Sequence, residues 1–285
     1  MTDGGEFTVC LTHDVDRVYK TYQYLTHDVR RGRLRGLRTL LTREEPYWCF
    51  PRIMEMEARH GVRSTFYFLE ETIPPDWLRP SSWKLSFGRY GFRDPRVSAV
   101  IRELDAGGWE VGLHGSYRSY RDGALLAREK DSLEQVLGRE VAGIRQHYLN
   151  LDVPDTWKLQ RAAGLRYDAS LGLRQDIGFP GGRRHPFTDP ESGMFVIPLA
   201  LMEGFLMNRA GRDVERAWAL TLPLLDEAQA HGATFVALWH PHLYNEDDFP
   251  GLAPLYERLV AECRARGARF RTCGQVWAEA AGGGA

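Results

Sequence analysis

The feature that most constrains the fold is a regular alternation of short apolar runs with helical patterns. The runs are rich in β-branched or aromatic residues, which predicts strands at 7–12, 64–69, 109–113, 142–145, 165–167, 194–198, 234–239 and 269–272. Between most of them apolar residues recur at three-to-four spacing, which predicts helices at 50–60, 95–106, 124–137, 154–163, 212–230 and 255–266. Strands that alternate with helices pair in parallel.

This alternation predicts an α/β fold, a distorted or incomplete (β/α) barrel of seven or eight units. An open doubly wound sheet is disfavoured, because no Gly-x-Gly-x-x-Gly motif follows the first expected strand. A chain of 285 residues with 43% hydrophobic residues can bury one large core. We therefore expect a single domain over residues 1–285.

Charge and cysteine content narrow the function classes. Lys and Arg number 37 and Asp and Glu 38, so the net charge of −1 gives no attraction toward nucleic acid. No apolar stretch approaches about 18 residues and no signal-peptide pattern is present, which predicts a cytoplasmic protein without a transmembrane segment. The four cysteines form no Cys-x-x-Cys pair and are expected to be reduced thiols rather than a zinc knuckle or a disulfide framework.

Polar residues follow several expected strands at their carboxyl ends, where barrels place their active sites. The first strand leads into Asp14 and Asp16, whose side chains share a face because they are two residues apart. Since two unpaired carboxylates repel each other, this pair predicts a metal ion or an arginine between them. A turn that caps the next helix is the alternative. The third, fourth and seventh strands are followed by His114, Arg145, His147, Tyr148, His240 and His242.

These motifs resemble those of the polysaccharide deacetylases of the NodB-homology type, metal-dependent N-deacetylases on a distorted (β/α) barrel. The first motif of that family corresponds to residues 11–16, as an Asp-x-Asp variant, and the second to the Glu-x-Gly-x-His pattern at 110–114. The resemblance implies that Asp14 is the catalytic base. It also implies that Asp16 and His114 bind the metal.

The later motifs of the family supply the other catalytic groups. Its arginine motif corresponds to Arg145 with Tyr148, and its strand-end Leu-x-x-His motif to residues 238–240, one residue shorter. The resemblance implies that Arg145 holds the catalytic base Asp14 in place. It further implies that the backbone N–H of Tyr148 stabilises the oxyanion and that His240 protonates the departing amine.

The second motif departs from the family in one position. A second metal-binding histidine usually stands four residues after the first, but here that residue is Arg118. Catalytic zinc normally has three protein ligands, so Asp16 and His114 leave one ligand missing. We predict that His147, at a neighbouring strand end, fills this place. A hydrogen-bonding role for His147, or a weak or absent metal site, remains the alternative.

Two residues are expected to hold other residues of the site in place. Glu203 stands just beyond the sixth expected strand and could orient His240, as a carboxylate orients a general acid. His13 alternates with Asp14, so its side chain should face away from the barrel interior. We expect His13 to be a supporting or buried structural residue.

Three further residues are candidates for substrate contact. Asp168 and Asp176 flank a polar loop that could hold sugar hydroxyls, although helix capping explains them equally well. Trp239 could stack against a sugar ring, although tryptophan at an element boundary is more often a core residue.

A long connection follows the first strand, and we interpret about 17–45 as a basic helical insertion. It could form a lid or a cationic wall that favours a phosphate-bearing or lipid-linked saccharide at a membrane surface. A solvated helix or a dimer face is the alternative.

The resemblance implies a metal-dependent hydrolase that removes an N-acetyl or similar N-acyl group from an amino-sugar saccharide or glycoconjugate. The cofactor would be a divalent metal, with zinc favoured by mixed oxygen and nitrogen ligands. Two alternatives stay open: a hydrolase of another non-peptide C–N bond in a small molecule, or a non-catalytic saccharide-binding protein on a decayed deacetylase scaffold.

Overall fold

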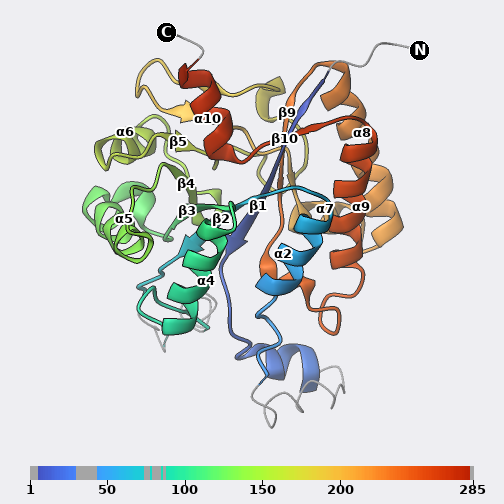
Figure 1. The fold of residues 1–285 in the computed structure, drawn as a ribbon, viewed down its shortest axis with the longest axis horizontal. Coiled ribbons are helices and arrows are strands. Elements are labelled where there is room, and N and C mark those ends of the chain that lie inside the picture. The colour runs from blue at the N-terminus through green and yellow to red at the C-terminus, as the bar shows by residue number, and fades with distance from the viewer. Residues whose placement is uncertain (1–5, 30–43, 74–77, 79–84, 86–87, 283–285) are drawn as a thin grey trace.

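The computed structural model describes residues 6–29, 44–73, 78, 85 and 88–282. Its centre is β1 (Thr8–Val15), which is buried along nearly its whole length and runs through the middle of the molecule (Figure 1). The helical part of the basic insertion expected after β1 falls mostly at 30–43, outside the described residues.

A single sheet surrounds β1. Its other strands are β2 (Thr65–Leu69), β3 (Glu110–Gly115), β4 (Gly143–Gln146), β5 (Tyr167–Asp168), β6 (Phe187–Thr188), β7 (Phe195–Val196), β8 (Leu201–Met202), β9 (Thr234–Leu238) and β10 (Arg269–Phe270). Their order is β6-β7-β5-β4-β3-β2-β1-β9-β8, with β10 paired to β1. All pairs are parallel except β6 with β7. Within the described residues no pairing joins the end strands β6 and β8, so the barrel is incomplete.

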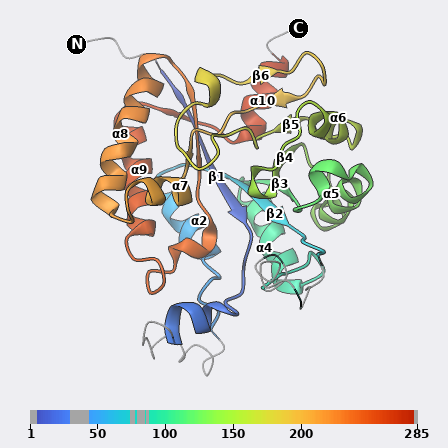
Figure 2. The same cartoon turned by 180° about the vertical axis from the view of Figure 1, so that it is seen from behind.

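Most of the helices cover the outside of this sheet, and the last of them closes its amino end. They are α2 (Phe50–Arg59), α4 (Pro95–Ala106), α5 (Gly123–Leu137), α6 (Asp155–Ala162), α7 (Glu203–Arg209), α8 (Val214–Ala230), α9 (Leu252–Ala265) and α10 (Cys273–Gly282). Shorter helical turns are η1 (Tyr24–Val29), η3 (Ser119–Arg121), η4 (His147–Leu149), η5 (Pro180–Gly182) and η6 (Pro241–Tyr244). Figures 1 and 2 show α8 and α9 on one side of β1 and α5 and α6 on the other.

The predicted α/β fold with an incomplete barrel is confirmed. Each expected strand and helix has a counterpart, with differences of a few residues at the ends. Among the described residues, strands β6 and β8, helices α7 and α10 and the short turns η3 to η6 were not predicted from the sequence. Strands β6 and β8 have two residues each, too few for a periodic pattern to show.

Several helices begin where the sequence supplies a cap. Asp94 accepts a hydrogen bond from the backbone N–H of Arg96 at the start of α4, where Pro95 is the first helical residue. Asp122 and Asp213 cap α5 and α8 in the same way. These caps fix where each helix leaves its preceding loop.

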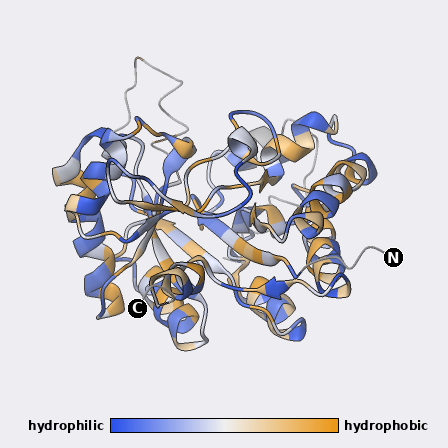
Figure 3. Ribbon diagram, turned by 90° about the horizontal axis from the view of Figure 1, so that it is seen from above, coloured by the Kyte–Doolittle hydropathy of each residue, from blue (hydrophilic) through white to orange (hydrophobic). Residues whose placement is uncertain are grey.

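The sheet separates two apolar layers, because neighbouring residues of a strand point to opposite faces. Val9, Leu11 and Val15 of β1 pack outward beneath the helices, whereas Cys10 packs inward. Figure 3 shows hydrophobic residues (orange) along the central strands inside a ring of helices that carry both colours. Thr12 and Asp14 continue the inward-facing side of Cys10, so they belong to the barrel interior.

The C-terminal helix α10 closes the amino end of the barrel. Cys273 and Val276 belong to the inner apolar layer, and the backbone N–H of Gly274 donates to Glu110 Oε2 at 2.7 Å. Access to the interior is therefore from the carboxyl ends of the strands. All four cysteines are buried free thiols, and no helix among the described residues is long and apolar enough to cross a membrane.

Candidate metal centre and active site

Asp14 and Asp16 both reach the barrel interior at the end of β1. The strand extends three residues beyond its apolar run, to Val15, so Asp14 lies on the strand and Asp16 directly after it. Asp14 is 3% exposed. One oxygen of Asp14, Oδ1, accepts a hydrogen bond at 3.0 Å from Nη1 of Arg145. An arginine thus neutralises one carboxylate of the pair and leaves the other to the histidines.

Two of the three guanidinium nitrogens of Arg145, Nε and Nη1, donate hydrogen bonds to described residues. Its Nη1 also donates to Thr12 Oγ1 at 2.7 Å, its Nε donates to the carbonyl of Ala169 at 2.9 Å, and the group lies 4.7 Å from the centre of the Tyr67 ring. The side chain is fully buried. Although burial disfavours the charged form, the negative charge of Asp14 raises the pKa of Arg145 above its ordinary value.

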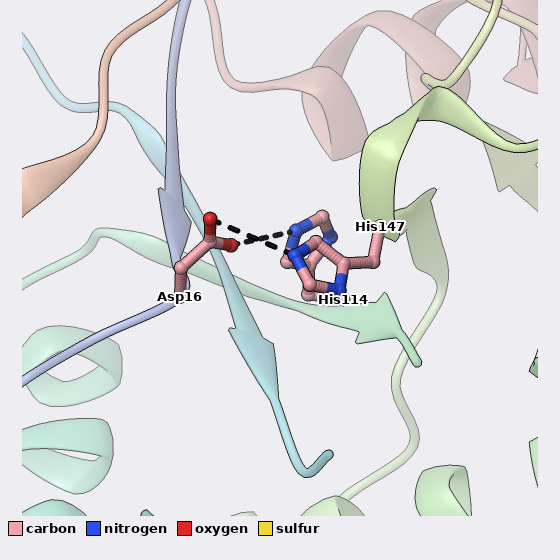
Figure 4. A group of neighbouring side chains, drawn as sticks. All are labelled: Asp16, His114 and His147. Carbon is pink, nitrogen blue, oxygen red and sulfur yellow. Dashed lines mark hydrogen bonds and ion pairs between the residues drawn. The ribbon is translucent and has the colours of Figure 1, made fainter. Parts of the chain in front are cut away.

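Asp16, His114 and His147 form a cluster in which one ligand atom from each lies within 4.8 Å of the others (Figure 4). His114 Nε2 is 3.2 Å from Asp16 Oδ1, and His147 Nε2 is 3.7 Å from Asp16 Oδ2. His114 Nδ1 lies 2.8 Å from the carbonyl of Arg145, which orients its Nε2 toward the cluster. Despite burial, His147 and His240 hold the pKa of Asp16 well below its usual range.

His147 reaches this cluster from η4, which directly follows β4. Its Nδ1 lies 3.6 Å from Glu71 Oε2. Burial opposes its charged form, but Asp16 and Glu71 raise the pKa of His147 to about 9. Arg118, which stands where the related family usually has its second histidine, is exposed to solvent.

His240 completes the constellation from the end of β9. Its Nε2 is 3.5 Å from Asp16 Oδ2, and its Nδ1 is 2.5 Å from Oε1 of the buried Glu203, the first residue of α7. Burial disfavours the charged imidazolium, but Glu203 and Asp16 raise the pKa of His240 well above its ordinary value. The arrangement can keep a protonated imidazole beside the candidate metal ligands.

These groups share one cavity of about 290 Å³. Its walls are formed by Asp14, Asp16, His114, His147, Tyr148, Leu149, Met202, Phe205, Leu238 and His240. Predicted residues from β1, β3, β4 and β9 therefore meet at one place, as the carboxyl ends of parallel strands should.

Besides Arg145 and Glu203, which contact residues of the cavity wall, four predicted residues do not line this cavity. Asp168 is buried and accepts hydrogen bonds from Gln160 and from both the backbone N–H and the hydroxyl of Ser170. Asp176 pairs with Arg209 at the surface. Asp168 is fully buried and therefore holds local structure rather than contacting sugar hydroxyls, whereas for Asp176, whose side chain is 47% exposed, the expected contact stays a prediction.

The other two, His13 and Trp239, lie on the outer side of the sheet. His13 is fully buried, with Nδ1 2.8 Å from the carbonyl of Trp239 and Nε2 2.9 Å from Glu57 Oε1. The Trp239 ring packs 5.4 Å from that of Tyr256, so it is placed for core packing rather than sugar stacking.

Glu71, which follows β2, was not predicted from the sequence. Its Oε2 accepts a hydrogen bond at 3.0 Å from the backbone N–H of Tyr117 and lies near His147. Glu71 therefore connects the loop after β3 to the metal cluster. Its place just beyond a strand end is the same signal that indicated the other site residues.

No protein-family model matches the chain, and no curated protein matches it. Among solved structures, a protein from Mycobacterium smegmatis assigned as a polysaccharide deacetylase is 19% identical, with a TM-score of 0.65 over 98% of this chain and 91% of the other. The Puue allantoinase is 12% identical, with a TM-score of 0.62 over 97% of this chain and 91% of its own.

A CE4 family pseudoenzyme from Bacillus anthracis is 10% identical, with a TM-score of 0.52 over 96% of this chain and 66% of its own. Because this fold occurs both in proteins named as enzymes and in a pseudoenzyme, activity has to be argued from the side chains of the site. The chain has the α/β fold of the polysaccharide deacetylases, with a candidate Asp–His–His metal centre at the carboxyl edge of its sheet.

Proposed function

We propose that this protein is a metal-dependent hydrolase that removes an N-acyl group from an amino-sugar saccharide or glycoconjugate. The observation that carries the proposal is that two neighbouring carboxylates have different partners. Asp16 faces the two histidines of the cluster, whereas Asp14 is bound by Arg145 and keeps its other oxygen, Oδ2, 3.7 Å from His114. One carboxylate can bind a metal while the other accepts a proton.

The residues fit a zinc ion. One carboxylate and two imidazoles are the three protein ligands that catalytic zinc commonly has, and they leave a position open for water or substrate. When bound, zinc polarises an amide carbonyl and lowers the pKa of water. Asp16, His114 and His147 would hold it.

The remaining side chains supply the proton transfers. Asp14 takes a proton from the attacking water, and Arg145 keeps the Asp14 carboxylate in place. The backbone N–H of Tyr148, at the cavity wall, stabilises the negative charge that develops on the amide oxygen. His240, kept protonated by Glu203, then gives a proton to the departing amine as the C–N bond breaks.

A screen of amine release tests this proposal. Zinc-loaded protein is incubated with N-acylated hexosamines, chitooligosaccharides and small cyclic amides, and new primary amines are measured. We expect release from an amino-sugar substrate that is lost in His240→Asn. Saccharide-dependent thermal stabilisation without any amine release would contradict the proposal and favour a binding protein, and turnover of cyclic amides alone would contradict the amino-sugar assignment.

A further inference from the structure

We infer that the N-acyl group of the substrate is an aliphatic chain longer than acetyl. This inference rests on the proposed function of the metal site and names the part of the substrate that the site selects. It follows from the composition of the active-site cavity and from what lies on either side of the metal cluster.

Beyond the metal cluster, the wall of the 290 Å³ cavity is apolar. It consists of Leu149 from η4, Met202 from β8, Phe205 from α7 and Leu238 from β9. Leu238 is buried and belongs to the inner apolar layer, against which Leu149 and Met202 also pack. The cavity is therefore continuous with the inner apolar layer of the barrel.

Such a wall favours hydrocarbon over sugar. A hydroxyl that leaves water for a place without a hydrogen-bond partner loses free energy, whereas a methylene gains it. The polar side chains of this cavity are those of Asp14, Asp16, His114, His147, Tyr148 and His240, and the proposed chemistry uses all of them except the Tyr148 hydroxyl. A saccharide seated against Leu149, Met202 and Phe205 would leave its hydroxyls without partners.

The other side of the cluster has the opposite character. Asp16, His147 and Tyr148 also line a second cavity, of about 40 Å³, together with Glu71 and Arg89 among others. Within the described part of the chain, Arg89 Nη2 is buried without a hydrogen-bond partner. A guanidinium N–H of this kind suits a saccharide oxygen.

The scissile amide would thus lie at the boundary of two unlike cavities. The second cavity, of about 40 Å³, is too small for a sugar ring, so the saccharide would lie over the polar side and reach Arg89 with a single hydroxyl. The acyl chain, which is apolar and ends, fits the apolar side.

The backbone at this boundary supports a functional origin for the apolar wall. Tyr148 and Leu149 have φ angles of 58° and 53°, a left-handed conformation that non-glycine residues adopt at a cost in free energy. This conformation of η4 brings both side chains to the cavity.

Alkyl hydroxamates chelate zinc, and their alkyl chain takes the place of the acyl chain of the substrate. Their binding therefore tests the inference without identifying the amine that carries the acyl group. Acetohydroxamate and hexanohydroxamate are titrated into zinc-loaded protein by calorimetry. We expect each buried methylene to tighten the dissociation constant by up to about fourfold, so that hexanohydroxamate binds at least tenfold more tightly than acetohydroxamate.

Cavity variants locate the alkyl chain. Met202→Trp should fill the cavity and Phe205→Ala should remove an apolar contact. Both variants should therefore bind hexanohydroxamate more weakly than the wild type does, with the affinity for acetohydroxamate unchanged. Val153→Trp, at a residue 47% exposed and outside the cavity wall, is the matched control and should change neither.

Three results would overturn the inference. Equal affinity for the two hydroxamates refutes the long acyl chain while the metal site stands. If N-hexyl acetohydroxamate, and not hexanohydroxamate, binds more tightly than acetohydroxamate, the apolar cavity takes the amine side of the substrate. Failure of every hydroxamate to bind refutes the metal site, and with it the proposed function.

Discussion

Replacement of Asp14 by Asn should separate catalysis, metal binding and stability. The change keeps the shape of the side chain but removes the negative charge beside Arg145, which is fully buried. Loss of one partner of a buried ion pair typically costs about 3–5 kcal/mol. Because an Asn oxygen can still accept the 3.0 Å hydrogen bond from Arg145, we expect the lower end, about 3 kcal/mol.

The same change should reduce turnover by about 10²–10⁴-fold, the usual contribution of a general base. Metal content should stay near one ion per chain, because Asp14 is outside the ligand set. Urea unfolding, amine release and elemental analysis measure the three effects. The double variant Asp14→Asn/Arg145→Met removes both charges, so it should recover stability but not turnover.

Asp168→Asn is the matched control, since Asp168 is an equally buried strand-end aspartate that accepts hydrogen bonds from two uncharged residues, Gln160 and Ser170. It should leave turnover close to that of the wild type. Near-normal turnover of Asp14→Asn would refute the assignment of the base. Unchanged stability would refute the argument from a buried ion pair.

Two further changes probe the groups around the site. Glu203→Gln removes the charge that raises the pKa of His240, so the alkaline limb of the kcat/KM profile should move to lower pH; an unmoved limb would exclude His240 as the acid. In α5, burial raises the pKa of Glu129 to about 7, so its contribution to folding is full below about pH 4.5 and is lost as the pH rises through 7. Glu129→Gln should therefore match the wild type near pH 4.5 and exceed it by about 3 kcal/mol at pH 8 in urea unfolding, and equal stability at both pH values would contradict this account.

Much of the site is predictable from the sequence because it depends on strand ends. Side chains two residues apart share a face, and the carboxyl ends of parallel strands meet, so the sequence pattern alone brings Asp14, Asp16, His114 and Arg145 together. The position of His147 is predicted from the ligand that Arg118 cannot supply. In the fold His147 does join the cluster and Arg118 is exposed.

What could not be predicted depends on contacts distant in the sequence. Asp168 lies at the end of its strand much as Asp14 does, but its hydrogen-bond partners Gln160 and Ser170 are close in sequence, whereas Arg145, the partner of Asp14, comes from β4. The length of β1 could not be read either. His13 follows the apolar run and is buried with its two ring nitrogens beside the Trp239 carbonyl and Glu57 of α2.

The most direct test of the account is the metal content of the purified protein and of His147→Ala, measured by elemental analysis after dialysis against zinc. We predict about one zinc ion per wild-type chain and a large loss in His147→Ala, because this histidine is the proposed third ligand. His242→Ala is the control, since the ring centre of His242 lies 5.7 Å from that of His240 but His242 is outside the cluster. This variant should retain its metal. A wild-type protein without zinc, or a His147→Ala protein that keeps it, would contradict the central claim.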